Sequence, residues 1–261
     1  MSEELLKTDK ERLNKVSSIL VSQPEPVDEN SPYGKLAAKY NLKIDFRKFI
    51  SIEPVDIRDF RKQKVNILAH TAIIFTSRNA VDHFFRIAGE SKVEIPTDMK
   101  YFCVSEQTAN YLQKYIVIRK RKIFSGERTA ADLLEIMKKH KTEKYLYPCS
   151  DVRKDDIPAF LEKNGYTFSE AVIYKTVTAN LSDLSEITYD IIAFFSPSGI
   201  ASLFDNFPNF EQKKTRIAAF GPTTAKAVKD AGLILDIQAP LPNAPSMTGA
   251  LELYIKRANN L

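Results

Sequence analysis

The sequence feature that most constrains the fold is a repeated order of short apolar runs and longer amphipathic stretches. The apolar runs, which predict β-strands, are residues 17–22, 72–77, 100–105, 144–149, 191–196 and 216–221. Helix-like stretches follow the last five of them, at residues 79–89, 107–115, 157–165, 199–207 and 223–232. Because strands that alternate with helices are typical of parallel sheets, the sequence predicts the α/β class. Gly165 and Gly232 close two of the stretches, where glycine commonly caps a helix.

Parts of this pattern occur twice along the chain. Residues 72–81 align with 191–200 at an offset of 119, which brings Ser77 onto Ser196. The later pairs, 101–112 with 217–228 and 129–139 with 248–257, follow in the same order at similar offsets. One such pair would mean little, because strand–helix units resemble one another. Three pairs in order predict two similar α/β domains.

Two further segments alternate polar and apolar residues without a helix behind them, at 42–55 and 170–179. This alternation is typical of a strand with one exposed face. Since one segment lies on each side of the first repeat, we expect them to pair as a linker between the domains. Two ordinary edge strands would show the same pattern.

Several common cofactor and metal sites are excluded by spacing. The closest two of the eight glycines are Gly221 and Gly232, so neither the dinucleotide-binding pattern G-x-G-x-x-G nor a phosphate-binding P-loop can occur. Cys103 and Cys149 are far apart, and the histidines lack the H-x-x-x-H spacing of a zinc site. We therefore expect no metal. The three histidines are His70, His83 and His140.

Charge and apolar content narrow the possible partners. The 38 lysines and arginines exceed the 33 aspartates and glutamates, which gives a net charge of +5 and suits an anionic ligand. The basic run at 119–122 lacks neighbouring aromatics, so a solvated turn is favoured over a nucleic-acid contact. The charged amino terminus does not resemble a signal peptide, and no apolar run approaches the ~20 residues that cross a bilayer. With two unpaired cysteines, these features predict a cytoplasmic protein without nucleic-acid or membrane partners.

Hydroxyl side chains recur where a predicted strand ends and a helix begins. Such residues commonly cap helices, and this is the simplest explanation for any one of them. The carboxyl ends of parallel strands also gather where ligands bind, and helix N-termini attract carboxylates and phosphates. Together with nearby cations they predict a ligand that carries several negative charges. The hydroxyl residues are Thr76, Ser77, Ser105, Thr108, Ser196, Ser198, Thr223 and Thr224, and the cations are Arg78, Arg128, Arg153 and Lys226.

Strong acid–base and nucleophilic groups are scarce. The sequence shows no Ser-His-Asp set and no paired-carboxylate motif. Cys149 is the one candidate nucleophile, and a small residue buried at a strand end is the competing interpretation. We therefore expect a reaction that depends on positioning and charge stabilisation.

Several segments in order give the chain a specific resemblance. IIFTSRNAV, the AVIYKT segment, FFSPSGI, AAFGPTTAKAVKDAG and APSMTGAL together resemble the uroporphyrinogen-III synthase family, from about Ser18 onward. FGPTTAKAV with FFSPSG upstream is the most discriminating part. The chain departs from the family pattern at Gln23, where a basic residue is usual, and in YPCSDVRKD, which lacks the expected glycine but keeps Arg153.

The resemblance implies two parallel-sheet α/β domains joined by a two-stranded β-ribbon. One domain would be discontinuous, combining residues 1–42 with 179–261, and residues 50–168 would form the other. The linker strands would be 43–49 and 169–178.

The implied reaction converts hydroxymethylbilane, a linear tetrapyrrole with eight carboxylates, to uroporphyrinogen III. Water leaves the terminal carbon, a spiro intermediate forms in a cleft between the domains, and ring D ends inverted. No cofactor or metal is implied, and the partner is this small molecule, bound by a monomer. Tyr174 matches the family's cleft tyrosine, which implies a hydrogen bond from its phenol to the departing hydroxyl that helps to generate the azafulvene cation; a linker tyrosine that only packs is the alternative. Implied substrate-binding residues are Thr76, Ser77, Thr108, Arg153, Ser196, Ser198, Thr223, Thr224 and Lys226.

Two other functions remain open from the sequence. A non-catalytic two-domain protein that binds an anionic small molecule would need the same fold and the same helix starts. An RNA-associated protein would rest only on the positive charge and the basic run at 119–122.

Overall fold

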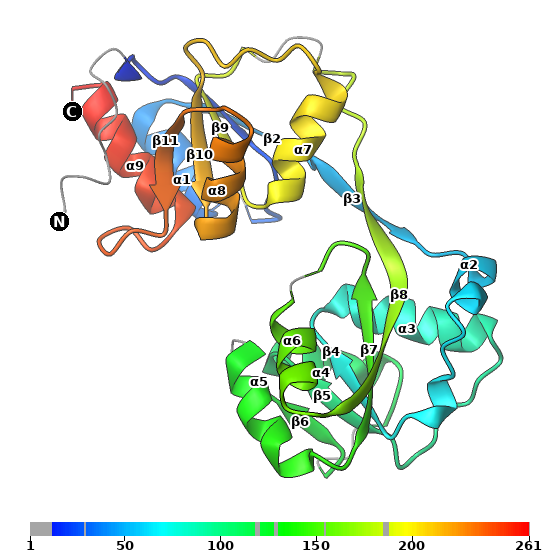
Figure 1. The fold of residues 1–261 in the computed structure, drawn as a ribbon. Helices are drawn as coiled ribbons and strands as arrows, with labels where there is room; N and C mark the ends of the chain where they lie inside the picture. Colours follow the sequence, from blue (N-terminus) through cyan, green and yellow to red (C-terminus); the bar gives the residue numbers. More distant parts are fainter. Residues whose placement is uncertain are drawn as a thin grey trace. The chain divides into compact units, whose positions relative to one another are not determined.

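A computed structural model describes residues 12–28, 30–117, 121–127, 130–153, 155–184 and 188–260. The chain divides into two compact units (Figure 1). The first unit comprises Met1–Ser51 and Val177–Leu261, and the second comprises Ile52–Thr176. Each unit contains its own sheet and is described by itself.

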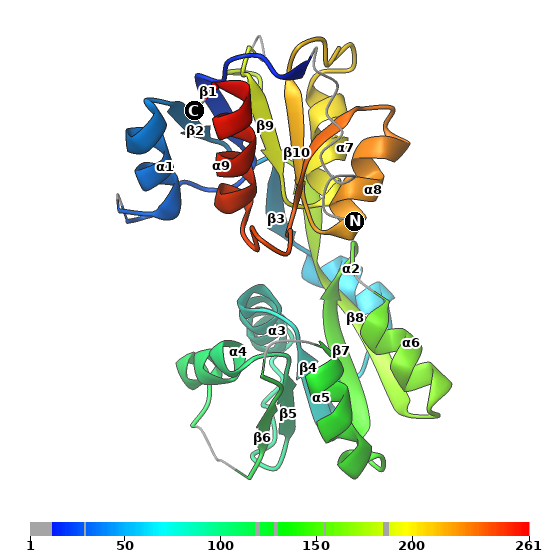
Figure 2. The same cartoon turned by 90° about the vertical axis from the view of Figure 1, so that its left-hand side faces the viewer.

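The first unit is built on a five-stranded sheet with the order β11-β10-β9-β1-β2, in which neighbouring strands are parallel. Helices α1 and α9 cover one face, and α7 and α8 cover the other (Figure 2). The strands are β1 (Ser18–Val21), β2 (Lys43–Phe46), β9 (Ile191–Phe194), β10 (Arg216–Phe220) and β11 (Leu235–Ala239), and the helices are α1 (Pro32–Tyr40), α7 (Pro197–Asn206), α8 (Pro222–Asp230) and α9 (Met247–Ala258).

Alternate residues of β1 and β9 enter the two cores of this unit. Ile19 and Val21 pack toward α9, whereas Leu20 packs with Ile192 and Phe194 toward α7 and α8. Both faces of the central strands are therefore apolar. This explains why the strands read as continuous hydrophobic runs in the sequence.

The second unit is built on a six-stranded sheet with the order β3-β8-β7-β4-β5-β6. The pairs among β4 to β8 are parallel. The strands are β3 (Ile50–Pro54), β4 (Ala72–Phe75), β5 (Lys100–Cys103), β6 (Ile123–Ser125), β7 (Lys144–Ser150) and β8 (Thr167–Thr178). The helices are α2 (Ile57–Lys62), α3 (Arg78–Glu90), α4 (Glu106–Tyr111), α5 (Ala130–Met137) and α6 (Asp156–Lys163), with 3-10 turns at Ile67–Ala69, Leu112–Lys114 and Lys138–His140.

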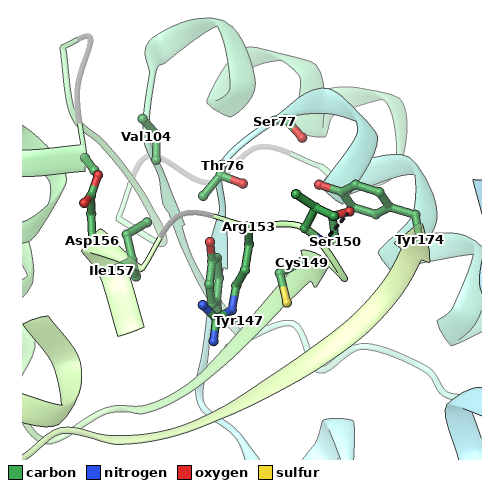
Figure 3. A pocket seen from close by; sticks show the side chains of 12 residues that line it. Thr76, Ser77, Val104, Tyr147, Cys149, Ser150, Arg153, Asp156, Ile157 and Tyr174 are labelled. Atoms are coloured by element: carbon green, nitrogen blue, oxygen red, sulfur yellow. Dashed lines mark hydrogen bonds between the residues drawn. The ribbon is translucent and has the colours of Figure 1, made fainter. Parts of the chain in front are cut away.

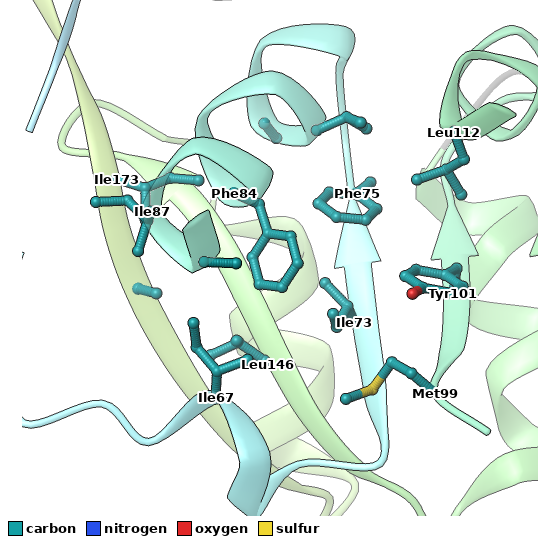
Figure 4. Packing of buried hydrophobic residues seen from close by; sticks show 14 of the residues in the cluster. Ile67, Ile73, Phe75, Phe84, Ile87, Met99, Tyr101, Leu112, Leu146 and Ile173 are labelled. Carbon is teal, nitrogen blue, oxygen red and sulfur yellow. The ribbon is translucent and has the colours of Figure 1, made fainter. Parts of the chain in front are cut away.

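The α3 side of this sheet carries one of its two hydrophobic cores (Figure 4). Ile73 and Phe75 of β4 pack there against Phe84 and Ile87 of α3. On the opposite face, alternate strand residues such as Ile74 pack with α5 and α6. Helix α3 therefore packs against β4 and begins just after the strand end at which the candidate site forms.

The predicted α/β architecture with parallel sheets is confirmed. Each of the six predicted strands is present, with ends shifted by one or two residues, and each predicted helix-like stretch contains a helix. Gly165 and Gly232 follow α6 and α8 at φ values of 67° and 74°, the left-handed conformation that ends a helix.

The structure does not show a separate linker strand at residues 43–49. Lys43–Phe46 instead forms β2, which pairs in parallel with β1 inside the first sheet. The segment 42–55 thus contains two strands, because the turn after Phe46 separates β2 from β3. The boundaries between the units fall within β3, after Ser51, and within β8, after Thr176. These two strands are neighbours in the six-stranded sheet. Among the described residues, no helix has the length and apolarity needed to span a membrane.

Candidate active site

A cavity of about 530 Å³ opens in the second unit at the carboxyl ends of β4, β5 and β7 (Figure 3). This edge of a parallel sheet is where ligands bind in α/β proteins. The lining combines hydroxyls, one guanidinium, one carboxylate, one thiol and an apolar wall. The lining residues are Thr76, Ser77, Val104, Ala130, Tyr147, Cys149, Ser150, Val152, Arg153, Asp156, Ile157 and Tyr174.

Tyr174 reaches this cavity from β8. It is 8% exposed, and its ring stacks on His83 with the ring centroids 5.2 Å apart. Burial raises the pKa of the phenol above its usual value, and the nearby Ser77 hydroxyl works in the opposite direction. The phenol therefore keeps its proton at neutral pH.

Thr76 and Ser77 connect β4 to α3. Ser77 is the N-cap of α3, and its hydroxyl accepts a hydrogen bond from the backbone N–H of Ala80 at 3.1 Å. The remaining N–H groups of the first turn have no partner within the helix, and the helix dipole adds positive potential there. This end of the cavity suits a carboxylate.

Among the predicted cations that the structure describes, Arg153 is the one that lines the cavity. Its Nε and Nη2 donate to the two carboxylate oxygens of Glu170 at 2.5 and 2.8 Å, and it also pairs with Asp155. These partners raise the pKa of the guanidinium, so it stays charged. Asp155 is 83% exposed and is the partner that an incoming carboxylate would replace more easily.

Cys149 lines the cavity as a neutral thiol. It is 1% exposed, and burial raises its pKa to about 11. Because the thiolate is the nucleophilic form, the structure favours the interpretation of Cys149 as a buried strand-end residue.

Thr108 belongs to the same unit but does not line the cavity. It is buried in the first turn of α4, where its backbone N–H donates to Ser105 at 3.3 Å and the two hydroxyls lie 3.1 Å apart. It stabilises a helix start beside the strand end that Val104 occupies.

The other predicted residues lie in the first unit, at the starts of α7 and α8. Ser196 caps α7 by accepting from Gly199 N–H at 3.2 Å, and Ser198 lies in the same turn. Thr223 is exposed and Thr224 is buried in the first turn of α8. The Lys226 side chain is 76% exposed and pairs with Asp230 at 2.5 Å.

Three residues named in the sequence analysis fall outside the described residues. They are the predicted cation Arg128, and Arg119 and Lys120 of the basic run. Lys122 of that run donates to the Asp98 carbonyl at 3.1 Å.

The apolar wall of the cavity was missed by the sequence analysis. Tyr147 is 4% exposed and alternates with Tyr145 and Cys149 along β7, so all three point into the same core. This spacing of two was readable in KYLYPC, and it indicates which residues approach the strand end. In the described part of the chain, no group of three His, Cys, Asp or Glu side chains is placed to hold a metal ion.

Comparisons with known proteins agree with one another. The family model described as uroporphyrinogen-III synthase HemD matches residues 33–249. The uroporphyrinogen-III synthase of Saccharomyces cerevisiae is 25% identical over 208 residues, covering 70% of this chain and 75% of that protein. The enzyme of the same name from Chlorobaculum parvum is 24% identical over 257 residues, covering 92% and 100%.

Two solved structures share the fold. Uroporphyrinogen-III synthetase from Helicobacter pylori aligns with a TM-score of 0.60 and 18% identity, covering 92% of this chain and 99% of that one. A mutant uroporphyrinogen III synthase from Thermus thermophilus aligns with a TM-score of 0.55 and 13% identity, covering 94% and 100%.

Proposed function

Since the chain belongs to the uroporphyrinogen-III synthase family, we propose that its second unit carries out the chemistry of that family's reaction at the cavity lined by Tyr174. The chain is a cyclising lyase of tetrapyrrole biosynthesis. It converts hydroxymethylbilane to uroporphyrinogen III with loss of water and inversion of ring D. The observation that carries the site proposal is the Tyr174 phenol in a cavity that also offers a helix start and a guanidinium.

Tyr174 is the proton donor in this proposal. As the bond from the terminal carbon to its hydroxyl breaks, the phenol gives its proton to the departing oxygen, which leaves as water. The carbon remains as an azafulvene cation, and the substituted carbon of ring D attacks it to give the spiro intermediate. Rearrangement inverts ring D, and the proton released at the end restores the phenol. Protons therefore balance over the cycle.

The substrate's carboxylates bind at helix starts in both units. In the second unit we assign Thr76, Ser77 and Arg153 to this role, with Thr108 stabilising the neighbouring turn. In the first unit, α8 begins at Gly221 without a side chain that caps it, which leaves N–H groups of its first turn for an anion. The further carboxylate-binding residues proposed in the first unit are Ser196, Ser198, Thr223, Thr224 and Lys226.

Some broader features are also part of the proposal. We assign the linker between domains 1–42 plus 179–261 and 50–168 to β3 and β8. The buried thiols of Cys103 and Cys149 are unpaired, which suits a reducing, cytoplasmic compartment. We propose a monomer whose partner is the small-molecule substrate.

The isomer assay tests this function. The purified protein, supplied with hydroxymethylbilane, is expected to yield the type III isomer, with products separated by chromatography. Type I isomer alone, which forms without enzyme, would contradict the assignment. A tight complex with tetrapyrroles but no type III product would favour the non-catalytic binding protein instead.

A further inference from the structure

The pairing of β7 with β8 contains a β-bulge next to Tyr174. Cys149 lies opposite Val172, but Ser150 lies opposite Tyr174, so Ile173 is an extra residue on β8. Bulges commonly re-aim a side chain beside an active site. Ile173 and Tyr174 both belong to the core on the α3 side, although successive residues of a regular strand face opposite sides. The bulge therefore turns Tyr174 toward α3.

Arg86 of α3 contacts the backbone at this bulge. Its Nη2 donates to the carbonyl oxygens of Ile173 at 3.2 Å and Val55 at 2.9 Å. The Ile173 carbonyl also accepts from the Val55 N–H at 3.1 Å, so the guanidinium joins the two segments where they pair. Its Nη1 donates to Glu90 at 2.9 Å, which fixes the side chain along its own helix. Three directed bonds on one planar group restrict the backbone that carries Tyr174.

His83 lies nearly one helical turn before Arg86 and contacts the Tyr174 ring itself. The two rings are 27° from parallel. The Nδ1 atom of His83 is buried and has no hydrogen-bond partner among the described residues. The imidazole therefore acts here as a stacking surface. Helix α3 therefore contacts Tyr174 or its neighbour at two points: His83 at the ring and Arg86 at the backbone of Ile173.

We propose that His83, through its stacked ring, and Arg86, through the bulge at Ile173, are positioning residues that aim the Tyr174 phenol into the cavity. This inference rests on the proposed role of Tyr174 as proton donor. Neither side chain lines the cavity, so both act through Tyr174 and not on the substrate. Misplacement of a catalytic group by about 1 Å can cost about 100-fold in rate, so the orientation of the phenol matters as much as its presence.

A double-mutant cycle on His83 and Tyr174 tests the inference. His83→Ala is expected to lower kcat by about tenfold with little change in KM, because a poorly oriented donor affects the reaction more than binding. His83→Phe retains a stacking ring and should restore most of the rate. In a Tyr174→Phe background, His83→Ala should cause no further loss, because the donor is already absent.

His140→Ala is the matched control. His140 is a half-buried histidine of the same unit that packs on Phe102 and Phe124 outside the cavity. It should lower the melting temperature without lowering kcat. The inference is overturned if His83→Ala leaves kcat unchanged, or lowers it equally with and without the Tyr174 hydroxyl.

Arg86 provides a second test if His83→Ala fails to fold. Arg86→Met removes the bonds to the Val55 and Ile173 carbonyls but retains part of the aliphatic stem. We expect it to lower kcat by about tenfold. In the Tyr174→Phe background this loss should disappear. An equal loss in that background would contradict the inference. Formation of only type I isomer by the wild-type protein would instead reject the proposed function. Type III product with a slow Tyr174→Phe but no coupling would reject only the positioning role.

Discussion

The two units begin corresponding helices in the same way but use them differently. Ser77 caps α3 and Ser196 caps α7, and each accepts from the N–H three residues later, at 3.1 and 3.2 Å. In the second unit, Ser77 also lines the cavity that Tyr174 reaches. Ser196 does not line that cavity. The repeat thus places capped helix starts in both units, whereas the cavity with the candidate proton donor belongs to the second unit.

The next helix of each unit, α4 or α8, differs in whether a side chain caps its N-terminus. Ser105 caps α4 in the second unit, whereas α8 in the first unit starts at Gly221, with φ of 84° and no side-chain cap. An anion would complete the α8 start without displacing a protein group. If the proposed roles hold, large losses of kcat should be confined to variants of the second unit, and variants of the first should alter KM.

The largest effect is expected for Tyr174→Phe. Loss of the proton donor should lower kcat by about 100-fold with KM little changed. Tyr101→Phe is the control, because Tyr101 is equally buried in the same unit but lies outside the cavity. Steady-state kinetics of both variants separate the two tyrosines. If Tyr174→Phe keeps the wild-type kcat, Tyr174 is not the proton donor and has only a packing role.

The matched pair Ser77→Ala and Ser196→Ala sharpens the comparison most directly. Each variant loses one N-cap and should lose about 1 kcal/mol of unfolding free energy in chemical denaturation. Only Ser77→Ala should lower kcat, by about tenfold, because Ser77 lines the cavity with Tyr174 and Ser196 does not. If both variants lose kcat equally, the two units do not divide the work as proposed.

A binding effect within the second unit is expected for Arg153→Gln. It removes a charge-assisted carboxylate contact and should raise KM by about tenfold with a smaller change in kcat. It also leaves the half-buried Glu170 without its partner, so the melting temperature should fall. The double variant with Glu170→Gln should recover the melting temperature but not KM. Recovery of both would show that Arg153 acts only through stability.

The smallest effect is expected for Lys226→Met in the first unit. Its exposed side chain should contribute about threefold in KM at low salt, and the difference should disappear as salt screens the charge. Lys229→Met is the control, because Lys229 is an exposed lysine of the same helix. A change in kcat, or an equal change in both variants, would contradict a binding role for Lys226.

Much of the fold was predictable because its strands are buried on both faces. Runs such as AIIF and IIAF have every residue buried, which makes them easy to distinguish from the amphipathic helices that follow. The short strand β6 and the exposed strand β2 lack that signature, and β2 was interpreted as a linker for this reason. Its pairing with β1 depends on tertiary contacts that local pattern does not contain.

The site was predictable only in part. Thr76, Ser77, Arg153 and Tyr174 lie together because the carboxyl ends of parallel strands meet at one edge. The roles of His83 and Arg86 were not predictable, because they depend on a one-residue register shift between β7 and β8. The ion pair that Arg153 makes with Glu170 likewise joins residues on separate segments, and spacing alone gives no sign of it.

The central claim is that chemistry belongs to the second unit and depends on the Tyr174 phenol. The most direct test is the single-turnover rate with saturating hydroxymethylbilane, measured side by side for the wild-type protein, Tyr174→Phe and Ser196→Ala. We predict that Tyr174→Phe alone is slowed, by about 100-fold, and that Ser196→Ala forms type III product at the wild-type rate. Equal rates for Tyr174→Phe and the wild type, or a slow Ser196→Ala beside a fast Tyr174→Phe, would contradict it.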